Sequence, residues 1–175
     1  MTEAGLEVPF AKELAVARRA AADAAAVLTR GGVPASVREK GRADLVTEVD
    51  EAAERAILAH LRRHFPADAI MAEESAAEVT SEGRIWIIDP LDGTANFVHG
   101  HPFACVSIAL ADEEGLAVGV VHAPFLREVY HAVRGGGAYL NDLPIRVSEV
   151  ATGRAGLYAT GFPFKEGSSR CSTDA

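Results

Sequence analysis

The feature that most constrains this chain is a series of five short apolar runs, at residues 70–72, 85–88, 105–110, 116–122 and 128–134. Turn-forming sequences follow three of them: DEEG at 112–115, AP at 123–124 and GGG at 135–137. Short apolar segments bounded by such turns predict β-strands. The sequence LNDLP at 140–144 predicts a further turn. Strands this close together indicate an antiparallel meander rather than alternating strands and helices.

Two helices are predicted before these strands. Residues 11–30 are rich in alanine, with apolar residues spaced for one helical face. Residues 49–65 repeat large apolar residues at four-residue steps, and Pro66 ends the run. Thr47 is the expected N-cap of this second helix, with Asp50 three positions on. The predicted class is therefore α+β, with two helices packed on a mostly antiparallel sheet.

Composition and charge exclude several classes of partner. The chain is 49% hydrophobic, enough to bury a core, and carries 17 basic and 25 acidic residues for a formal charge of -8. A nucleic-acid binder needs a basic surface, so none is expected as a partner. No apolar run approaches the roughly 20 residues of a membrane-spanning helix, and residues 1–9 do not resemble a signal peptide. We therefore expect a cytoplasmic protein without a membrane partner.

The two cysteines, Cys105 and Cys171, are too few for a disulfide scaffold or a zinc site. Because Cys105 lies in an apolar run, the sequence predicts a buried thiol there. It is badly placed for a nucleophile.

The stretch WIIDPLDGT, residues 86–94, leads from an apolar strand into two carboxylates, Asp89 and Asp92. Pro90 stiffens the backbone between them by fixing φ. Because Asp, Pro and Gly all favour turns, a surface turn is one interpretation. The other is a site for Mg²⁺, which takes oxygen ligands together with water, and the Leu91 carbonyl is a further oxygen donor.

Gly93 and Thr94 come next, and both are suited to binding an anion. A glycine lets the backbone approach a phosphate closely. A helix that began here would present free N–H groups to that phosphate. The Thr94 hydroxyl can hold an attacking water molecule.

Further acidic residues stand next to the predicted elements. Glu73 and Glu74 follow the run at 70–72, and Asp44 and Asp50 flank the start of the second helix. Each has an ordinary interpretation as well, because loop carboxylates are solvated and Asp50 suits the positive end of a helix dipole. Brought together, these carboxylates would repel one another strongly unless cations or water lay between them.

Several segments match one family in the same order. They read KGRADLVTEVD (40–50), AEES (72–75), WIIDPLDGTANFVHGHP (86–102), VSIAL (106–110), GVV (119–121), GGGAYLN (135–141) and ATGFP (159–163). Together they resemble the inositol monophosphatase family of metal-dependent, lithium-sensitive phosphatases, with Ala72 where the family has glycine. The likeness covers roughly residues 10–164. It implies the N-terminal part of the layered α/β sugar-phosphatase fold.

The resemblance implies a Mg²⁺ centre. Glu73, Asp89 and the Leu91 carbonyl would hold one ion, and Asp89 and Asp92 would share a second. Asp50 would reach a third, more loosely held ion, largely through water.

The same resemblance assigns catalytic and phosphate-binding roles. Glu73 and Thr94 would orient the attacking water, with the Thr47–Asp50 pair in support. The backbone N–H groups of Gly93 and Thr94 would hold the phosphate. Lys40 is expected near the metal site, and Asp44 belongs to the same motif.

The implied reaction is Mg²⁺-dependent hydrolysis of a phosphate monoester by an activated water, with inositol 1-phosphate as the first candidate. Histidinol phosphate, fructose bisphosphate and 3′-phosphoadenosine nucleotides are alternatives within the family.

The family continues past ATGFP with a second half that carries a W-D-x-A-x-G motif, which this sequence lacks. We therefore expect a C-terminally truncated member, with a metal-binding portion at 1–164 and an irregular tail at 165–175. An inactive metal-binding remnant is the competing interpretation. The full-length family is expected to form homodimers.

Overall fold

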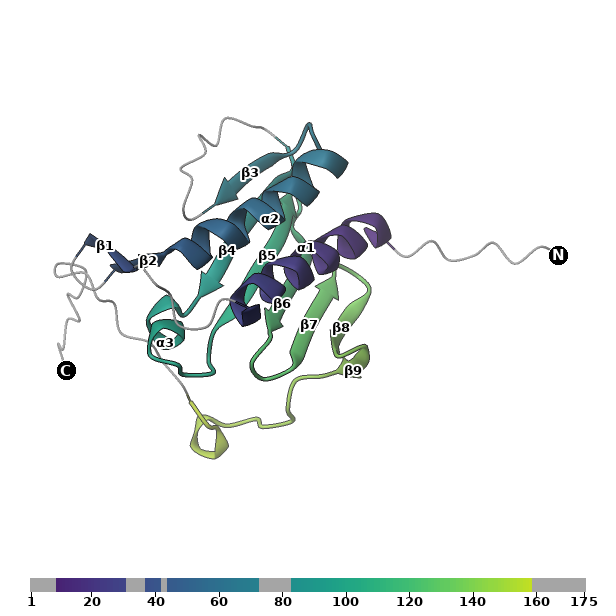
Figure 1. Cartoon of the computed structure of the whole chain (residues 1–175). Helices are drawn as coiled ribbons and strands as arrows, with labels where there is room; N and C mark the ends of the chain where they lie inside the picture. Colours follow the sequence, from purple (N-terminus) through teal and green to yellow (C-terminus); the bar gives the residue numbers. More distant parts are fainter. Residues whose placement is uncertain (1–8, 31–36, 42–43, 73–82, 159–175) are drawn as a thin grey trace, which may run out of the picture.

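The computed structural model describes residues 9–30, 37–41, 44–72 and 83–158 (Figure 1). Two helices, α1 (Ala11–Arg30) and α2 (Glu48–His64), lie side by side on one face of a sheet. The helix predicted at 11–30 is confirmed at both ends. The second helix begins and ends one residue earlier than predicted.

The main sheet has seven strands in chain order, which confirms the predicted meander. Only its first pair, β3 with β4, is parallel, and all other neighbours are antiparallel. The predicted α+β class with a mostly antiparallel sheet is therefore confirmed. The strands are β3 (Ala69–Ala72), β4 (Ile85–Asp92), β5 (Cys105–Asp112), β6 (Gly115–Ala123), β7 (Glu128–Val133), β8 (Gly137–Leu140) and β9 (Leu143–Ile145).

Four short elements were not predicted as strands. β1 (Val37–Gly41) and β2 (Asp44–Thr47) form a separate antiparallel hairpin just before α2. The turn predicted at 140–144 contains only Asn141 and Asp142, whose φ angles are 48° and 65°. Positive φ at both positions is typical of a two-residue hairpin turn, and it lets Leu143 and Pro144 enter β9. β8 begins at the last of the three glycines that predicted a turn.

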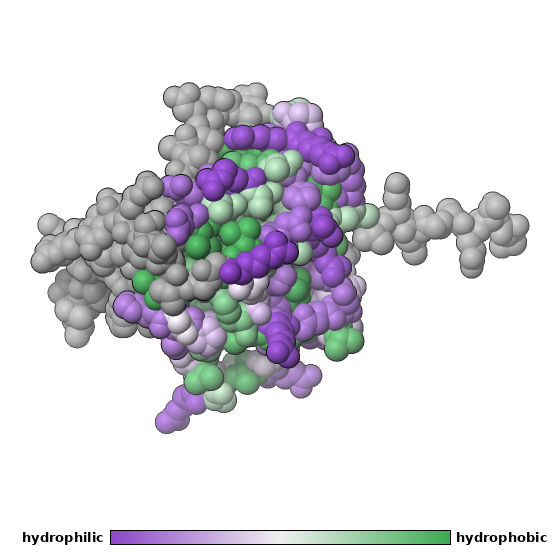
Figure 2. All heavy atoms as spheres, in the orientation of Figure 1, coloured by the Kyte–Doolittle hydropathy of each residue, from purple (hydrophilic) through white to green (hydrophobic). Residues whose placement is uncertain are grey.

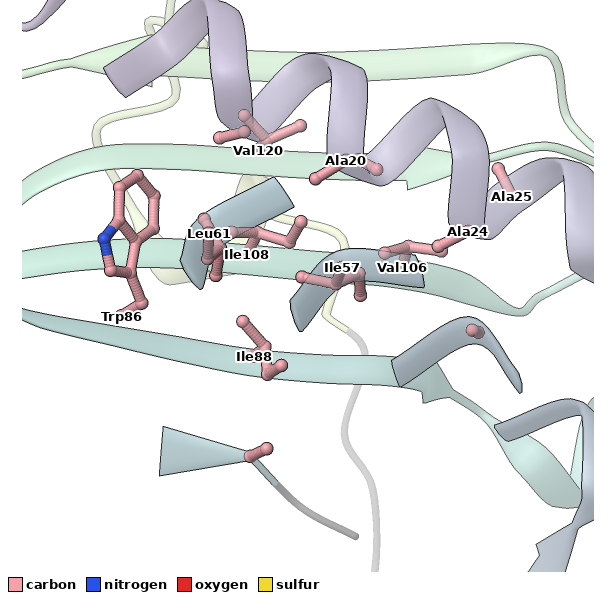
Figure 3. Packing of buried hydrophobic residues seen from close by; sticks show 14 of the residues in the cluster. Ala20, Ala24, Ala25, Ile57, Leu61, Trp86, Ile88, Val106, Ile108 and Val120 are labelled. Atoms are coloured by element: carbon pink, nitrogen blue, oxygen red, sulfur yellow. The ribbon is translucent and has the colours of Figure 1, made fainter. Parts of the chain in front are cut away.

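The core lies between the helices and the sheet (Figure 3). Because strand side chains alternate between faces, every second residue of β4 to β6 points toward the helices. Alanines of α1 such as Ala20 and Ala24 are fully buried, and their small side chains let the helix lie close to β5 and β6. Large residues of α2, Ile57 and Leu61, fill the space above Trp86 and Ile88 (Figure 3). On the opposite, outward side of the helices the surface is largely hydrophilic (Figure 2).

Polar contacts tie the two helices to each other and tie the segment after α2 to the sheet. The ring nitrogen Nε2 of His60 on α2 lies 2.8 Å from an Asp23 oxygen on α1, and this hydrogen bond lowers the pKa of Asp23. The indole N–H of Trp86 donates to Asp68 at 2.9 Å. Within the described residues, no helix is both long and apolar enough to cross a membrane.

Truncating a core leucine tests the packing between α2 and the sheet. Leu61→Ala is expected to lower the free energy of unfolding by about 2–5 kcal/mol, because it leaves a cavity beneath the helices. Leu116→Ala is the matched control, since Leu116 on β6 is 68% exposed and its loss is expected to change stability by less than about 0.5 kcal/mol. Urea unfolding of both variants gives the comparison. Equal losses would contradict the described packing.

Candidate metal and phosphate site

The two carboxylates of the DPLDGT sequence lie at the end of β4, which continues through Pro90 to Asp92. The pairing of β4 with β5 is regular up to Asp89 opposite Ser107, becomes irregular, and resumes with Asp92 opposite Cys105. A proline has no N–H to donate to a ladder, which favours such an irregularity at Pro90. The sequence is thus a distorted strand end and not a free surface turn.

Gly93 ends the strand and begins the short helix α3 (Thr94–Val98). Its φ is 85°, in the left-handed region that favours glycine. A Cβ at this position would lie 2.7 Å from the carbonyl oxygen of Phe103, which also accepts a hydrogen bond from the Asn96 side chain. Glycine is therefore required at the point where the resemblance places a phosphate.

The Thr94 hydroxyl joins three segments. It lies 3.1 Å from the Asp50 carboxylate on α2 and 3.0 Å from the Leu91 carbonyl on β4. A hydroxyl has one proton and two lone pairs, so it donates to one of these oxygens and can still accept a hydrogen bond from a third group. The arrangement leaves Thr94 able to hold a water molecule.

Asp50 is only 2% exposed and belongs to the first turn of α2. A helix N-terminus stabilises a nearby negative charge, which offsets part of the cost of burying this carboxylate. Asp50 can therefore be a helix-start residue, as the sequence suggests, and still take the role in the site that is proposed for it.

Asp89 and Asp92 have different surroundings. Asp89 is half-buried, and one of its oxygens accepts a hydrogen bond from the Leu91 backbone N–H at 3.1 Å. Asp92 is exposed, and the thiol of Cys105 donates to its carboxylate across 3.7 Å. Carboxylate and carbonyl oxygens are the ligands that Mg²⁺ prefers, so the donor types fit this ion.

The described residues supply only part of a complete metal site. Nowhere in residues 9–30, 48–72 and 83–158 do three or more His, Cys, Asp or Glu side chains converge as metal ligands would. Glu73 and Glu74 lie outside the described residues. β3, however, ends one residue before Glu73, with Ala72 paired in parallel to Ile88 and thus next to Asp89 in register.

The remaining predicted residues lie on the β1–β2 hairpin. Lys40 is in β1, and Asp44 and Thr47 are the ends of β2, which contacts both α2 and α3. Their side chains lie outside what the structure describes, so the predicted N-cap role of Thr47 stays a prediction. His99 and His101 are exposed residues after α3, as expected for loop positions.

Cys105 corrects one expectation and adds a residue to the site. Its thiol is half-buried rather than buried, and it faces Asp92. Burial, and next the negative charge of Asp92, raise the pKa of Cys105 to about 11. This makes it a poor nucleophile at neutral pH. The sequence could not show the contact, because it depends on the irregular register between β4 and β5.

A cavity of about 450 Å³ opens beside these residues. Asp92, Gly93 and Cys105 line one side of it, and Leu126 and Tyr130 line another. The site thus borders a space of mixed polar and apolar character.

A pair of glycine variants tests the close approach at Gly93. Gly100→Ala is the matched control, because Gly100 also has a positive φ of 71°, but a Cβ added there would meet no atom within 4 Å. That variant is expected to cost about 1–2 kcal/mol of stability through its backbone conformation alone. Gly93→Ala is expected to cost about 1–3 kcal/mol more, because its Cβ meets the Phe103 carbonyl. Similar unfolding midpoints for the two variants would contradict the geometry.

Thiol alkylation tests the surroundings of Cys105. With a pKa of about 11, only about a thousandth of this thiol is ionised at pH 8, so iodoacetamide should modify it far more slowly than glutathione. Asp92→Asn should lower the pKa and accelerate the reaction. Mass spectrometry of the Cys105 peptide, with EDTA present, gives the rates. Modification of the unaltered chain at the rate of glutathione would disprove the raised pKa.

Comparison with known proteins identifies relatives of this chain. A relative from Solanum lycopersicum, "Inositol monophosphatase 3", is 47% identical over 129 residues, which cover 71% of this chain and 48% of the relative. "Nus factor SuhB" of Pseudomonas aeruginosa is 48% identical over 134 residues, covering 75% of this chain and 49% of the relative. Among solved structures, "Thermotoga maritima IMPase TM1415" has a TM-score of 0.75 and 42% identity, over 80% of this chain and 55% of that one.

The chain thus spans about half the length of the relatives it matches. A family model described as "Inositol monophosphatase family" matches residues 11–173, which is most of the chain. The chain belongs to the inositol monophosphatase family.

Proposed function

We propose that this chain is the metal-binding part of a Mg²⁺-dependent phosphatase that hydrolyses small phosphate monoesters. The observation that carries the proposal is the Thr94 hydroxyl, held between the Asp50 carboxylate and the Leu91 carbonyl. Asp89 and Asp92 lie on either side of Leu91 in the sequence of the same strand end. A group that can position water therefore lies beside oxygen ligands for a hard cation.

The metal-binding roles follow from the position of each oxygen. Asp89, Asp92 and the Leu91 carbonyl would hold Mg²⁺ from β4. Glu73 would complete the set, which the pairing of Ala72 with Ile88 supports. Asp50 would act on a third ion through water, consistent with its burial at the start of α2.

Phosphate binding is assigned to the backbone at Gly93 and Thr94. The left-handed conformation of Gly93 turns the chain from β4 into α3, so the N–H groups of this turn can face an anion. Bound Mg²⁺ would neutralise the phosphate, lower the pKa of water and stabilise the departing oxygen.

The side chains of the site would position the water. Because Thr94 can donate its proton to Asp50, its oxygen lone pair is free to accept a hydrogen bond from the water. Glu73 would act on the same water, and Thr47 would support Asp50.

The first candidate substrate is inositol 1-phosphate, because the family and a similar plant protein are named inositol monophosphatases. Histidinol phosphate, fructose bisphosphate and 3′-phosphoadenosine nucleotides are further candidates. A second candidate function is a metal- or phosphate-binding remnant without turnover. A cytoplasmic location, a homodimer in the full-length form and the absence of a nucleic-acid partner remain part of the proposal.

The test is Mg²⁺-dependent phosphate release from inositol 1-phosphate, together with calorimetric Mg²⁺ binding. Asp92→Asn is expected to lower both turnover and Mg²⁺ affinity at least tenfold, because it removes the negative charge of a carboxylate that would bind the ion. Thr94→Val should lower turnover, and Thr94→Ser should retain it, because serine keeps the hydroxyl. Glu113→Gln is the control, since it removes one negative charge from an exposed position in the β5–β6 turn.

The outcomes separate the two functions. Turnover that Asp92→Asn abolishes supports the phosphatase. Mg²⁺ binding without turnover, lost in Asp92→Asn, supports the remnant. If Asp92→Asn and Glu113→Gln behave alike, the site is misassigned.

A further inference from the structure

The side chain of Asn96 ties the short helix α3 to the loop that follows it. Its amide nitrogen Nδ2 donates a hydrogen bond of 2.7 Å to the carbonyl oxygen of Phe103. Its own backbone carbonyl accepts another from the His101 N–H, also at 2.7 Å. Asn96 is exposed to solvent, yet it holds the returning chain at two points. This residue therefore closes the loop between α3 and β5.

The bond to Phe103 lies just beyond the last paired residues of β4 and β5. The register of this pair resumes after its irregularity with Asp92 opposite Cys105. The next residue, Gly93, turns away from the strand with a φ of 85°. The Asn96 amide thus acts as a side-chain substitute for a ladder hydrogen bond, and it continues the contact between the two segments past the end of β4.

Asn96, Phe103 and Gly93 meet at one point. A Cβ built on Gly93 would lie 2.7 Å from the Phe103 carbonyl oxygen and 3.4 Å from the Asn96 amide nitrogen. The amide therefore holds this carbonyl against the glycine, at a place where a side chain would not fit. Because Thr94 follows directly, a change in the Gly93 conformation would move the hydroxyl that contacts α2 and β4.

We propose that Asn96 is a positioning residue for the candidate site. Its amide fixes the turn at Gly93, and that turn places the Thr94 hydroxyl against the end of β4, which carries Asp89 and Asp92. The effect of Asn96 on turnover rests on the proposed function, whereas its link to the strand end does not.

A pair of asparagine variants isolates the amide. Asparagine offers two N–H donors, whereas an aspartate at neutral pH offers only acceptors, so Asn96→Asp keeps the shape of the side chain and sets an oxygen against the Phe103 carbonyl. Asn141→Asp is the matched control. The Asn141 amide donates to the Arg127 carbonyl at 3.1 Å and so closes the β6–β7 turn instead of the turn at Gly93. Both variants lose one side-chain donor and add one negative charge.

The test is amide hydrogen exchange of the full 175-residue chain, followed by NMR. The reporter is the amide of Leu91, which donates to the Asp89 carboxylate at 3.1 Å. Leu91 is not adjacent to Asn96 in the sequence, so the substitution does not alter its intrinsic exchange rate. Asn96→Asp is expected to accelerate its exchange at least about fivefold, the usual effect of losing one hydrogen bond. Asn141→Asp should leave it unchanged.

Two further amides separate positioning from other effects. The His101 N–H donates to Asn96 and reports on the loop, and the amide of Ile108 in β5 reports on global unfolding. Acceleration of His101 without Leu91 would overturn the proposal in favour of a role in the loop alone. Acceleration of Leu91 and Ile108 by the same factor would overturn it in favour of a general loss of stability. An unchanged rate for Leu91 in Asn96→Asp would also overturn it.

Phosphate release from inositol 1-phosphate gives the second measurement. Asn96→Ala, which adds no charge, is expected to lower kcat at least about fivefold and to lower it more than it raises KM, because a displaced Thr94 hydroxyl would misplace the water. In a Thr94→Val chain the same substitution should change kcat less than about twofold. Equal losses in both chains would overturn the positioning role. A complete lack of turnover would contradict the proposed phosphatase, while the exchange rate of Leu91 would still decide the role of Asn96.

Discussion

The buried carboxylate of Asp50 determines how the helix layer meets the sheet at the site. A charged group with 2% exposure is costly unless it is hydrogen-bonded, and the Thr94 hydroxyl lies at hydrogen-bonding distance. That hydroxyl also contacts the carbonyl of Leu91, so the start of α2, the end of β4 and the start of α3 are fixed together. The positions of Asp89 and Asp92 depend on this junction, because both belong to the strand end that it holds.

Much of the fold follows from sequence periodicity. The two helices and the strands from β3 to β7 were predicted within a few residues, because their apolar residues recur at helical or strand spacing. The strands β1, β2, β8 and β9 were missed for a physical reason. Each contains only three to five residues, among them a charged residue, a glycine or a proline. Their pairing depends on a partner strand rather than on their own sequence.

The site was predicted in a different way. Asp89, Asp92, Gly93 and Thr94 lie within six consecutive residues, so the motif alone brings them together. Asp50 is 44 residues from Thr94, and only the fold shows the contact between them. The metal-binding and catalytic roles of all these residues stay predictions. For Glu73, Lys40, Asp44 and Thr47 the side-chain positions stay predictions as well, since these side chains lie outside the described part of the chain.

The last strand of the sheet limits how this chain can associate. β9 contains three residues, and one of them is Pro144, which has no N–H to offer a further strand. A short edge with a proline resists edge-to-edge growth, the usual route from an open sheet to fibrils. The solubility of the isolated chain therefore depends more on exposed apolar side chains of the sheet, such as Met71 and Ile87, than on this edge. Contacts between side chains, rather than backbone pairing, would determine whether it aggregates.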